Sequence, residues 1–282
     1  MVQLERIVKW AEQNSSITAL LLSGSLAGRG KKDIFSDYDI AVFGNNFDFI
    51  ANDEWIKQIG NYLVCIHDNF ESLNYEIPTR LTIFDDISKV DFSFHPVQLL
   101  QTLTELEKLP DDYNIGYRIL LDKDGTAARL KAPTFTGFVI RKPSVEEFEN
   151  NVKEFWFETY HVAKYISRGD LWTAKSRAWA AKKFLLSMVE WNHGIKARWK
   201  FSPKKDGKNM KDWVDKKIWK ELEDCFGRFD KRDSWKALQK TIKLYQRIAG
   251  KTADYLKYSY DQKLDNGISR FIKKRSWARA DK

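Results

Sequence analysis

The sequence predicts an α+β protein in which a mixed sheet with helices, over residues 1–135, precedes a bundle of helices over residues 136–282. Short apolar runs rich in β-branched and aromatic residues fill the first half, as is typical of strands. Long stretches with apolar residues three and four apart fill the second half, as is typical of amphipathic helices. The chain of 282 residues is long enough for two domains of ordinary size.

The first half is expected to alternate strands with a few helices. Residues 3–14 and 97–107 carry apolar side chains at helical spacing. The expected strands are residues 17–22, 38–43, 62–66, 80–84, 89–95 and 117–121. Asp68, Glu71 and Glu76 could attract a polycationic molecule, but solvated loops are the favoured explanation for this acidic group.

The second half is expected to consist of long helices. Ser144 and Glu147 form a capping box, in which the serine side chain accepts from an early backbone N–H and the glutamate returns the bond. A further long helix is expected to start near Ser234. The polar segment 200–209 contains Pro and Gly and is expected to be a loop.

The charge is divided between the two halves. Residues 1–140 hold 13 basic and 20 acidic side chains, a net charge of −7, whereas residues 141–282 hold 35 basic and 19 acidic ones, a net charge of +16. An acidic half suits metal ions or a cationic substrate, and a basic half suits phosphates. A well-solvated, lysine-rich helical surface explains the second half equally well.

The sequence points to a cytoplasmic protein with no membrane partner. It has no apolar run near the ~18–20 residues of a membrane span and no secretory signal. Its two cysteines, Cys65 and Cys225, are far apart and have no metal-binding spacing, so a disulfide framework is not expected.

The segment from Leu20 to Phe43 carries the chemistry. A buried strand ends at Gly24 and Ser25, where a glycine lets the backbone approach a phosphate and the serine hydroxyl can donate to it. Eleven residues separate Ser25 from Asp37, which with Asp39 heads the next strand. Carboxylates two apart on a strand leave one face, roughly 7 Å apart at their Cα atoms, which suits Mg²⁺.

A third carboxylate is expected from the strand over residues 89–95. Val90, Phe92 and Phe94 form its apolar face, so Asp91, Ser93 and His95 point the other way. Asp91 can then complete the metal site or accept the proton of an attacking hydroxyl. For His95, a partly buried structural role is the favoured interpretation. Competing motifs, such as a P-loop, kinase motifs or a dinucleotide-type GxGxxG, are missing from the sequence.

The combination of GS and DxD resembles the DNA polymerase β-like nucleotidyltransferase superfamily. Nearly the whole chain is similar to the aminoglycoside (streptomycin) 6-adenylyltransferase family, in the stretches SDYDIAVF, KVDFSFHP, ILLDKDG, RKPSVEEFENNVKEFW and GKNMKDW and in the Lys164 to Asp170 segment. The resemblance implies a polymerase β-like N-terminal domain and a helical C-terminal domain that helps to hold the substrates.

The resemblance also implies roles for individual residues. By this match, the metal ligands are Asp37 and Asp39, and the third carboxylate and base is Asp91. The phosphate contacts are Gly24 and Ser25. Two basic residues that could neutralise the β- and γ-phosphates also match, Lys164 and Lys208. Glu154 is the rival candidate for the base. Family members tend to have Arg directly after GS, whereas this chain has Leu26, so either Arg29 reaches the triphosphate or nucleotide binding differs.

The implied activity is transfer of AMP from ATP to a hydroxyl of a streptomycin-like antibiotic, with two Mg²⁺ ions, release of pyrophosphate and inactivation of the drug. The protein would act as a monomer or homodimer. Three alternatives stay open: another small acceptor such as a lincosamide, an RNA acceptor suggested by the basic half, and a non-catalytic nucleotidyltransferase that serves as an antitoxin.

Overall fold

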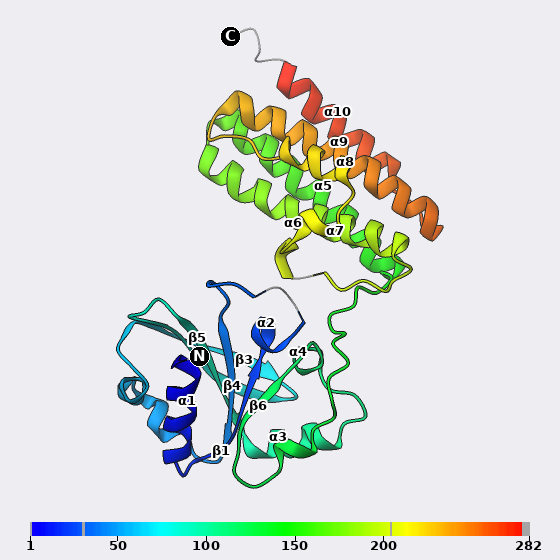
Figure 1. Cartoon of the computed structure of the whole chain (residues 1–282). Coiled ribbons are helices and arrows are strands. Elements are labelled where there is room, and N and C mark those ends of the chain that lie inside the picture. Colours follow the sequence, from blue (N-terminus) through cyan, green and yellow to red (C-terminus); the bar gives the residue numbers. More distant parts are fainter. Residues whose placement is uncertain (1, 30–31, 204, 278–282) are drawn as a thin grey trace. The chain divides into compact units, whose positions relative to one another are not determined.

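The chain forms two compact units, residues Met1–Gly137 and Phe138–Lys282, in a computed structural model that describes residues 2–29, 32–203 and 205–277. Figure 1 shows the strands together in the first unit and long helices in the second. This division confirms the α+β class expected from the two kinds of apolar pattern. Among the helices of the described residues, none combines the length and apolar character that a membrane span requires.

The first unit is built on a six-stranded mixed sheet of order β3-β4-β5-β2-β1-β6. Its strands are β1 (Ile17–Ser23), β2 (Tyr38–Gly44), β3 (Tyr62–Ser72), β4 (Tyr75–Phe84), β5 (Lys89–Pro96) and β6 (Arg118–Asp122). β2 and β5 pair in parallel, and the other neighbours are antiparallel. All six strands expected from the sequence are therefore present.

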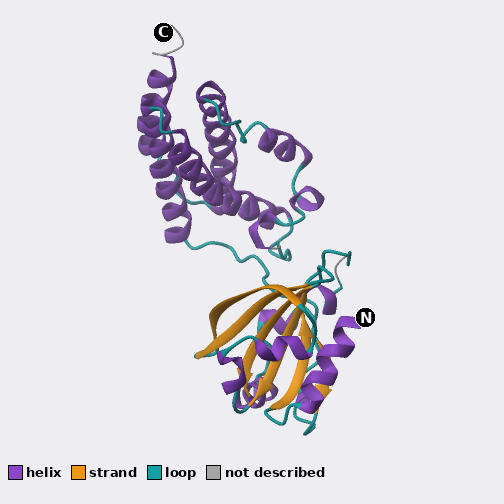
Figure 2. Cartoon of the chain, turned by 90° about the vertical axis from the view of Figure 1, so that its left-hand side faces the viewer, coloured by secondary structure: helices purple, strands orange, loops and turns teal. Residues whose placement is uncertain are grey.

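Apolar side chains form a core on each face of the sheet, and Figure 2 shows helices of this unit beside the strands. The helices and turns of this unit are α1 (Val2–Gln13), α2 (Gly24–Ala27), η1 (Asp48–Ala51), η2 (Glu54–Gln58), α3 (Val97–Glu105), α4 (Asp111–Asn114) and η3 (Ala127–Arg129). Ile7 and Trp10 of α1 pack with Ile40 on one face. Leu99 of α3 packs with Phe43 on the other. The alternation of β2 thus divides its side chains between two cores.

The hairpin of β3 and β4 is longer than the sequence predicts. The two strands continue past the expected residues 66 and 80 to a turn in which Leu73 and Asn74 have φ values of 48° and 67°. The expectation that Asp68, Glu71 and Glu76 lie in loops is wrong, because all three lie on these strands. β3 is an edge strand whose outer half is mostly exposed, so it lacks the alternation that marks a half-buried strand.

The second unit is helical, with α5 (Val145–Arg168), α6 (Leu171–Lys196), η4 (Lys205–Gly207), α7 (Met210–Trp213), α8 (Lys216–Glu223), α9 (Lys231–Leu256) and α10 (Gln262–Trp277). The capping box before α5 is confirmed: Ser144 Oγ accepts from Glu147 N at 3.1 Å, and Glu147 Oε2 accepts from Ser144 N at 2.8 Å. α9 starts three residues before the expected Ser234, because Asp230 caps it by accepting from Asp233 N at 2.8 Å.

Candidate active site

Two of the expected aspartates lie side by side at the centre of the sheet. In the parallel pairing of β2 and β5, Asp39 is opposite Asp91. Phe43 is opposite His95 further along the same strands. Each lies four residues after an aspartate on its own strand, so both share the face of the two aspartates. Asp37 lies directly before β2. The structure thus brings the carboxylates of the DxD motif next to the third one, although more than 50 residues separate them in the sequence.

A lysine joins two of these carboxylates. Lys89 Nζ donates to Asp91 Oδ2 at 2.7 Å and to Asp37 Oδ2 at 2.9 Å. Burial opposes its charge, but the bonds to Asp91 and Asp37 outweigh this effect and raise the pKa of Lys89. Lys89 therefore stays protonated at neutral pH and offsets the repulsion among the acids.

Lys89 was not among the residues expected in the site. The signal was present, since Lys89 is two residues before Asp91 and therefore shares its face of β5. A lysine at the first residue of a strand is usually solvated, so alternation alone does not single it out.

The carboxylates fit a divalent cation. Asp91 Oδ1 is buried and has no hydrogen-bond partner among the described residues. A buried carboxylate oxygen without a partner is costly unless a cation or water satisfies it. Hard carboxylate oxygens are also the donors that Mg²⁺ prefers. The set of Asp37, Asp39 and Asp91 thus has the donor chemistry for this ion, and in the ion-free protein Lys89 supplies the positive charge.

Gly24 makes the closest backbone approach to these acids. Its φ of +66° lies in the left-handed region that favours glycine, and a Cβ added there would be 1.9 Å from Asp39 Oδ2. Only glycine therefore allows the turn after β1 to lie against the Asp39 carboxylate.

A pocket of about 340 Å³ opens at this place in the first unit. Gly24 and both paired aspartates line it. Two further acids, Asp68 of β3 and Asp112 of α4, line it as well. Burial, followed by the charge of Asp111, raises the pKa of Asp112. Because the carboxylates of Asp39, Asp68, Asp91 and Asp112 all line the pocket, it is strongly acidic and suits a cation or a cationic molecule.

His95 supports the floor of the pocket. Its ring stacks on Phe43 at a centroid distance of 4.9 Å, and Nε2 lies 2.8 Å from Ser93 Oγ. Only 3% of His95 is exposed, and this burial lowers its pKa to about 4. The imidazole is therefore neutral at neutral pH, and it is more deeply buried than the sequence predicts.

This burial predicts a pH-dependent stability. The pKa of His95 is 6.5 without burial and about 4 in the folded protein, so the unfolded chain binds more protons between these values. Stability from the neutral imidazole is present above pH 6.5 and is lost as the pH falls towards 4. We expect His95→Phe to remove about 2 kcal/mol of the loss in unfolding free energy between about pH 7.5 and about pH 5. Urea unfolding at both pH values measures it, and an unchanged pH dependence in the variant would contradict the account.

The other residues expected at the phosphates of the first unit lie near the same turn. Ser25 is half-buried in α2, directly after Gly24. Arg29 is exposed, and its guanidinium lies 4.0 Å from the ring centroid of Phe135. Leu26 packs against the core with its apolar side chain. The position directly after Gly24 and Ser25 is thus used for packing in this chain.

The remaining expected residues belong to the helical unit. Lys164 is half-buried on α5, with Nζ 5.3 Å from the ring centroid of Tyr165. Glu154 is exposed on the same helix. Lys208 is exposed between η4 and α7, and its neighbour Gly207 lines a cavity of about 790 Å³ within this unit. The roles of Lys164 and Lys208 in nucleotide binding and of Glu154 as the rival base stay predictions.

Comparison with known proteins finds a family model and several similar proteins. A family model described as "Streptomycin adenylyltransferase" matches residues 2–275. An aminoglycoside 6-adenylyltransferase from Campylobacter jejuni is 27% identical over 95% of this chain and 94% of its own length. One from Bacillus subtilis strain 168 is 25% identical over the same shares. A crystal structure of an aminoglycoside 6-adenyltransferase from Bacillus subtilis covers 98% of both chains, with 22% identity and a TM-score of 0.47.

The family match extends over both units, and it includes every aspartate of the pocket. The matched residues therefore include the carboxylates of β2 and β5 that meet beside the glycine turn. The chain belongs to the streptomycin adenylyltransferase family.

Proposed function

We propose that this protein transfers AMP from ATP to a hydroxyl of a streptomycin-like aminoglycoside, with release of pyrophosphate and inactivation of the drug. The observation that carries the proposal is the meeting of Asp39 and Asp91 across β2 and β5, with Asp37 tied to Asp91 through Lys89. The names of the related proteins support the aminoglycoside as acceptor.

Asp37, Asp39 and Asp91 would hold Mg²⁺, two ions in the proposed arrangement. When bound, Mg²⁺ supplies charge neutralisation for the triphosphate and lowers the pKa of the attacking hydroxyl. Gly24 and Ser25 would hold phosphate oxygens, because the turn after β1 brings backbone close to Asp39. Arg29, Lys164 and Lys208 are the basic side chains proposed to hold the rest of the triphosphate in line for attack.

Asp91 is the proposed general base. The acceptor oxygen forms a bond to the α-phosphorus, the bond from that phosphorus to the bridging oxygen breaks, and pyrophosphate leaves with the electron pair. The hydroxyl proton passes to a carboxylate oxygen of Asp91, which lies in the pocket beside Asp39. We prefer Asp91 to Glu154, because Asp91 lines the acidic pocket, whereas Glu154 is exposed on the surface of α5.

The acidity of the pocket favours a cationic acceptor. Asp68 and Asp112 line it in addition to the proposed metal ligands, and two carboxylates beyond those ligands would attract the ammonium or guanidinium groups of an aminoglycoside. A nucleic-acid acceptor would be repelled by the same charges.

The direct test is incubation of the purified protein with ATP, Mg²⁺ and a panel of acceptors, followed by mass spectrometry. We expect a single AMP adduct on streptomycin, formed only with metal and blocked by EDTA. An adduct on a lincosamide alone would move the proposal to another acceptor. Label incorporated into RNA, or no adduct at all, would overturn it, and GTP in place of ATP tests the nucleotide.

Replacing Lys89 with methionine separates its charge from its bulk. Lys89 offsets repulsion among the carboxylates when no metal is bound, so we expect Lys89→Met to lower the unfolding free energy of the metal-free protein by about 1 kcal/mol. The same change removes a cation that competes with the metal, so Mn²⁺ is expected to bind more tightly. Electron paramagnetic resonance of free Mn²⁺ measures the affinity.

Lys57→Met is the matched control for that experiment. Lys57 pairs with Glu54 on the surface of the same unit, with Nζ 2.7 Å from Oε1. Its loss is expected to leave Mn²⁺ affinity at the wild-type value. Weaker or unchanged Mn²⁺ binding in Lys89→Met would show that Lys89 does not occupy the metal position.

A further inference from the structure

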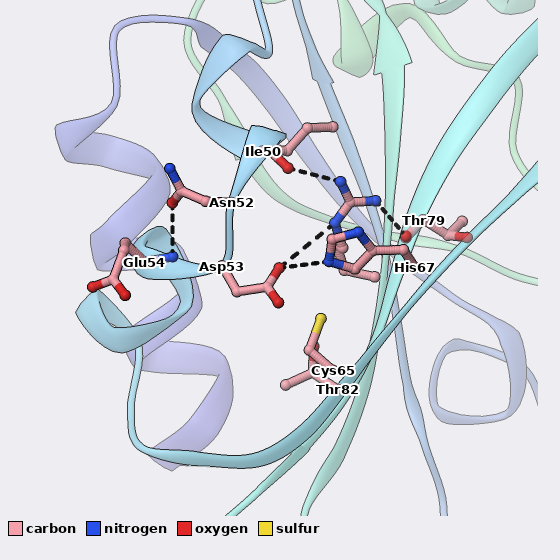
Figure 3. Close-up of polar contacts among 9 residues, drawn as sticks. Ile50, Asn52, Asp53, Glu54, Cys65, His67, Thr79 and Thr82 are labelled. Atoms are coloured by element: carbon pink, nitrogen blue, oxygen red, sulfur yellow. Dashed lines mark hydrogen bonds and ion pairs between the residues drawn. The ribbon is translucent and has the colours of Figure 1, made fainter.

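A second group of metal-ligating side chains lies on the opposite face of the sheet from the acidic pocket. Cys65 and His67 are two residues apart on β3, so they share a face, whereas Asp68 of the pocket points the other way. Asp53 lies at the start of η2, in the segment that covers this face. Figure 3 shows the Asp53 carboxylate, the Cys65 sulfur and the His67 ring directed towards one another.

The distances fit a small chelating site. His67 Nε2 lies 2.8 Å from Asp53 Oδ1. One ligand atom of each of Asp53, Cys65 and His67 lies within 4.8 Å of the other two. The Cys65 sulfur accepts a weak hydrogen bond from Thr82 Oγ1 at 3.7 Å. Rotations of side chains that are already adjacent would therefore bring three donors around one ion.

The donor types select the metal. A thiolate, an imidazole and a carboxylate suit Zn²⁺, which takes four tetrahedral ligands and accepts water as the fourth. Mg²⁺ prefers oxygen donors and does not compete well for a thiolate. We therefore expect this donor set to favour Zn²⁺ and the carboxylates of the pocket to favour Mg²⁺.

The local charge permits a divalent ion. Arg80 Nε lies 3.8 Å from Asp53 Oδ1, so the site contains one fixed positive charge. Before metal binding this charge balances the Asp53 carboxylate, and deprotonation of Cys65 on binding adds the second negative charge that a divalent ion needs. Burial raises the pKa of the free Cys65 thiol, so the incoming metal takes the place of its proton.

We propose that Asp53, Cys65 and His67 bind one Zn²⁺ ion per chain. The ion would tie the η1–η2 segment to the edge strand β3. In the metal-free state the same segment is held by Arg80, which donates from Nη2 to Ile50 O at 2.7 Å. The contact of His67 Nε2 with Asp53 Oδ1 holds this segment as well, and zinc would strengthen its attachment to the hairpin, so we expect zinc to raise the melting temperature of the protein.

The test uses Co²⁺ as the probe, because a cobalt–thiolate bond gives a charge-transfer absorption that carboxylates do not give. The full-length protein is titrated with Co²⁺ in excess Mg²⁺, and Zn²⁺ is then added to displace the cobalt. We expect one equivalent of Co²⁺, a thiolate band and complete displacement by Zn²⁺. Cys65→Ser should abolish the band, and His67→Gln should weaken metal affinity on the order of 100-fold.

The second free cysteine supplies the matched control. Cys225 is buried in the helical unit, so Cys225→Ser removes a thiol but should keep the band and the zinc-dependent rise in melting temperature. Asp39→Asn should keep both as well, because it alters only the pocket. Absence of a thiolate band, its persistence in Cys65→Ser, or its loss in Cys225→Ser would each overturn the proposal.

Discussion

Asp39→Asn is expected to reduce kcat/KM for AMP transfer on the order of 10³-fold, because it removes a charge proposed to hold the metal. Asparagine keeps the size of the side chain, so the loss reports the carboxylate rather than packing. A metal ligand of this kind stabilises the transition state by several kcal/mol, and about 4 kcal/mol corresponds to that factor. Steady-state kinetics with streptomycin and ATP measure the change.

A stability measurement and a surface control variant show whether the loss of activity in Asp39→Asn is specific to the metal site. Asp39 is opposite Asp91 on the neighbouring strand, and urea unfolding of the metal-free variant checks that it is folded. Asp86→Asn is the control, because Asp86 lies in the exposed β4–β5 turn, where it accepts from Ser88 N at 2.9 Å. Substantial activity in Asp39→Asn would contradict the metal assignment.

Gly24→Ala is expected to reduce AMP transfer about 100-fold and to lower the unfolding free energy by about 1–3 kcal/mol. The added Cβ would lie 1.9 Å from Asp39 Oδ2, so either the turn or the carboxylate must move. A displacement of about 1 Å at a reacting centre is enough for a loss of this size. Kinetics and urea unfolding of the same preparation separate the two effects.

Gly125→Ala is the matched control for backbone strain. Gly125 has a φ of +75°, close to that of Gly24, but nothing lies within 4 Å of a Cβ added there. The Gly125→Ala variant should therefore be destabilised by backbone strain alone, and its folded molecules should transfer AMP at the wild-type rate. Equal loss of activity in both variants would show that the contact with Asp39 does not matter.

The sequence predicts the fold best where burial is complete. β1 and β2 are runs of buried apolar residues, and β5 alternates between an apolar core face and the face that carries Asp91, so all three are visible in the sequence. The outer half of β3 is exposed on both faces and is paired with β4 alone, so no period of apolar residues marks it. Its extent is decided by pairing across the turn at Leu73 and Asn74, which is a tertiary effect.

The same distinction applies to the pocket. Alternation along β5 was enough to place Asp91 on one face, and a parallel register brought it to Asp39. The position of Asp112 depends on the path of the chain from α3 to α4, which no spacing in the sequence reveals. Asp39 and Asp91 were therefore predictable from strand patterns, whereas Asp112 was not.

The most direct measurement is anomalous X-ray diffraction from crystals of the wild-type protein grown with Mn²⁺ and a non-hydrolysable ATP analogue. The account predicts anomalous density within coordination distance of carboxylate oxygens of Asp37, Asp39 and Asp91, with Lys89 Nζ moved away from Asp37. Manganese bound elsewhere, or a nucleotide bound with Lys89 still joining Asp37 and Asp91, would contradict it.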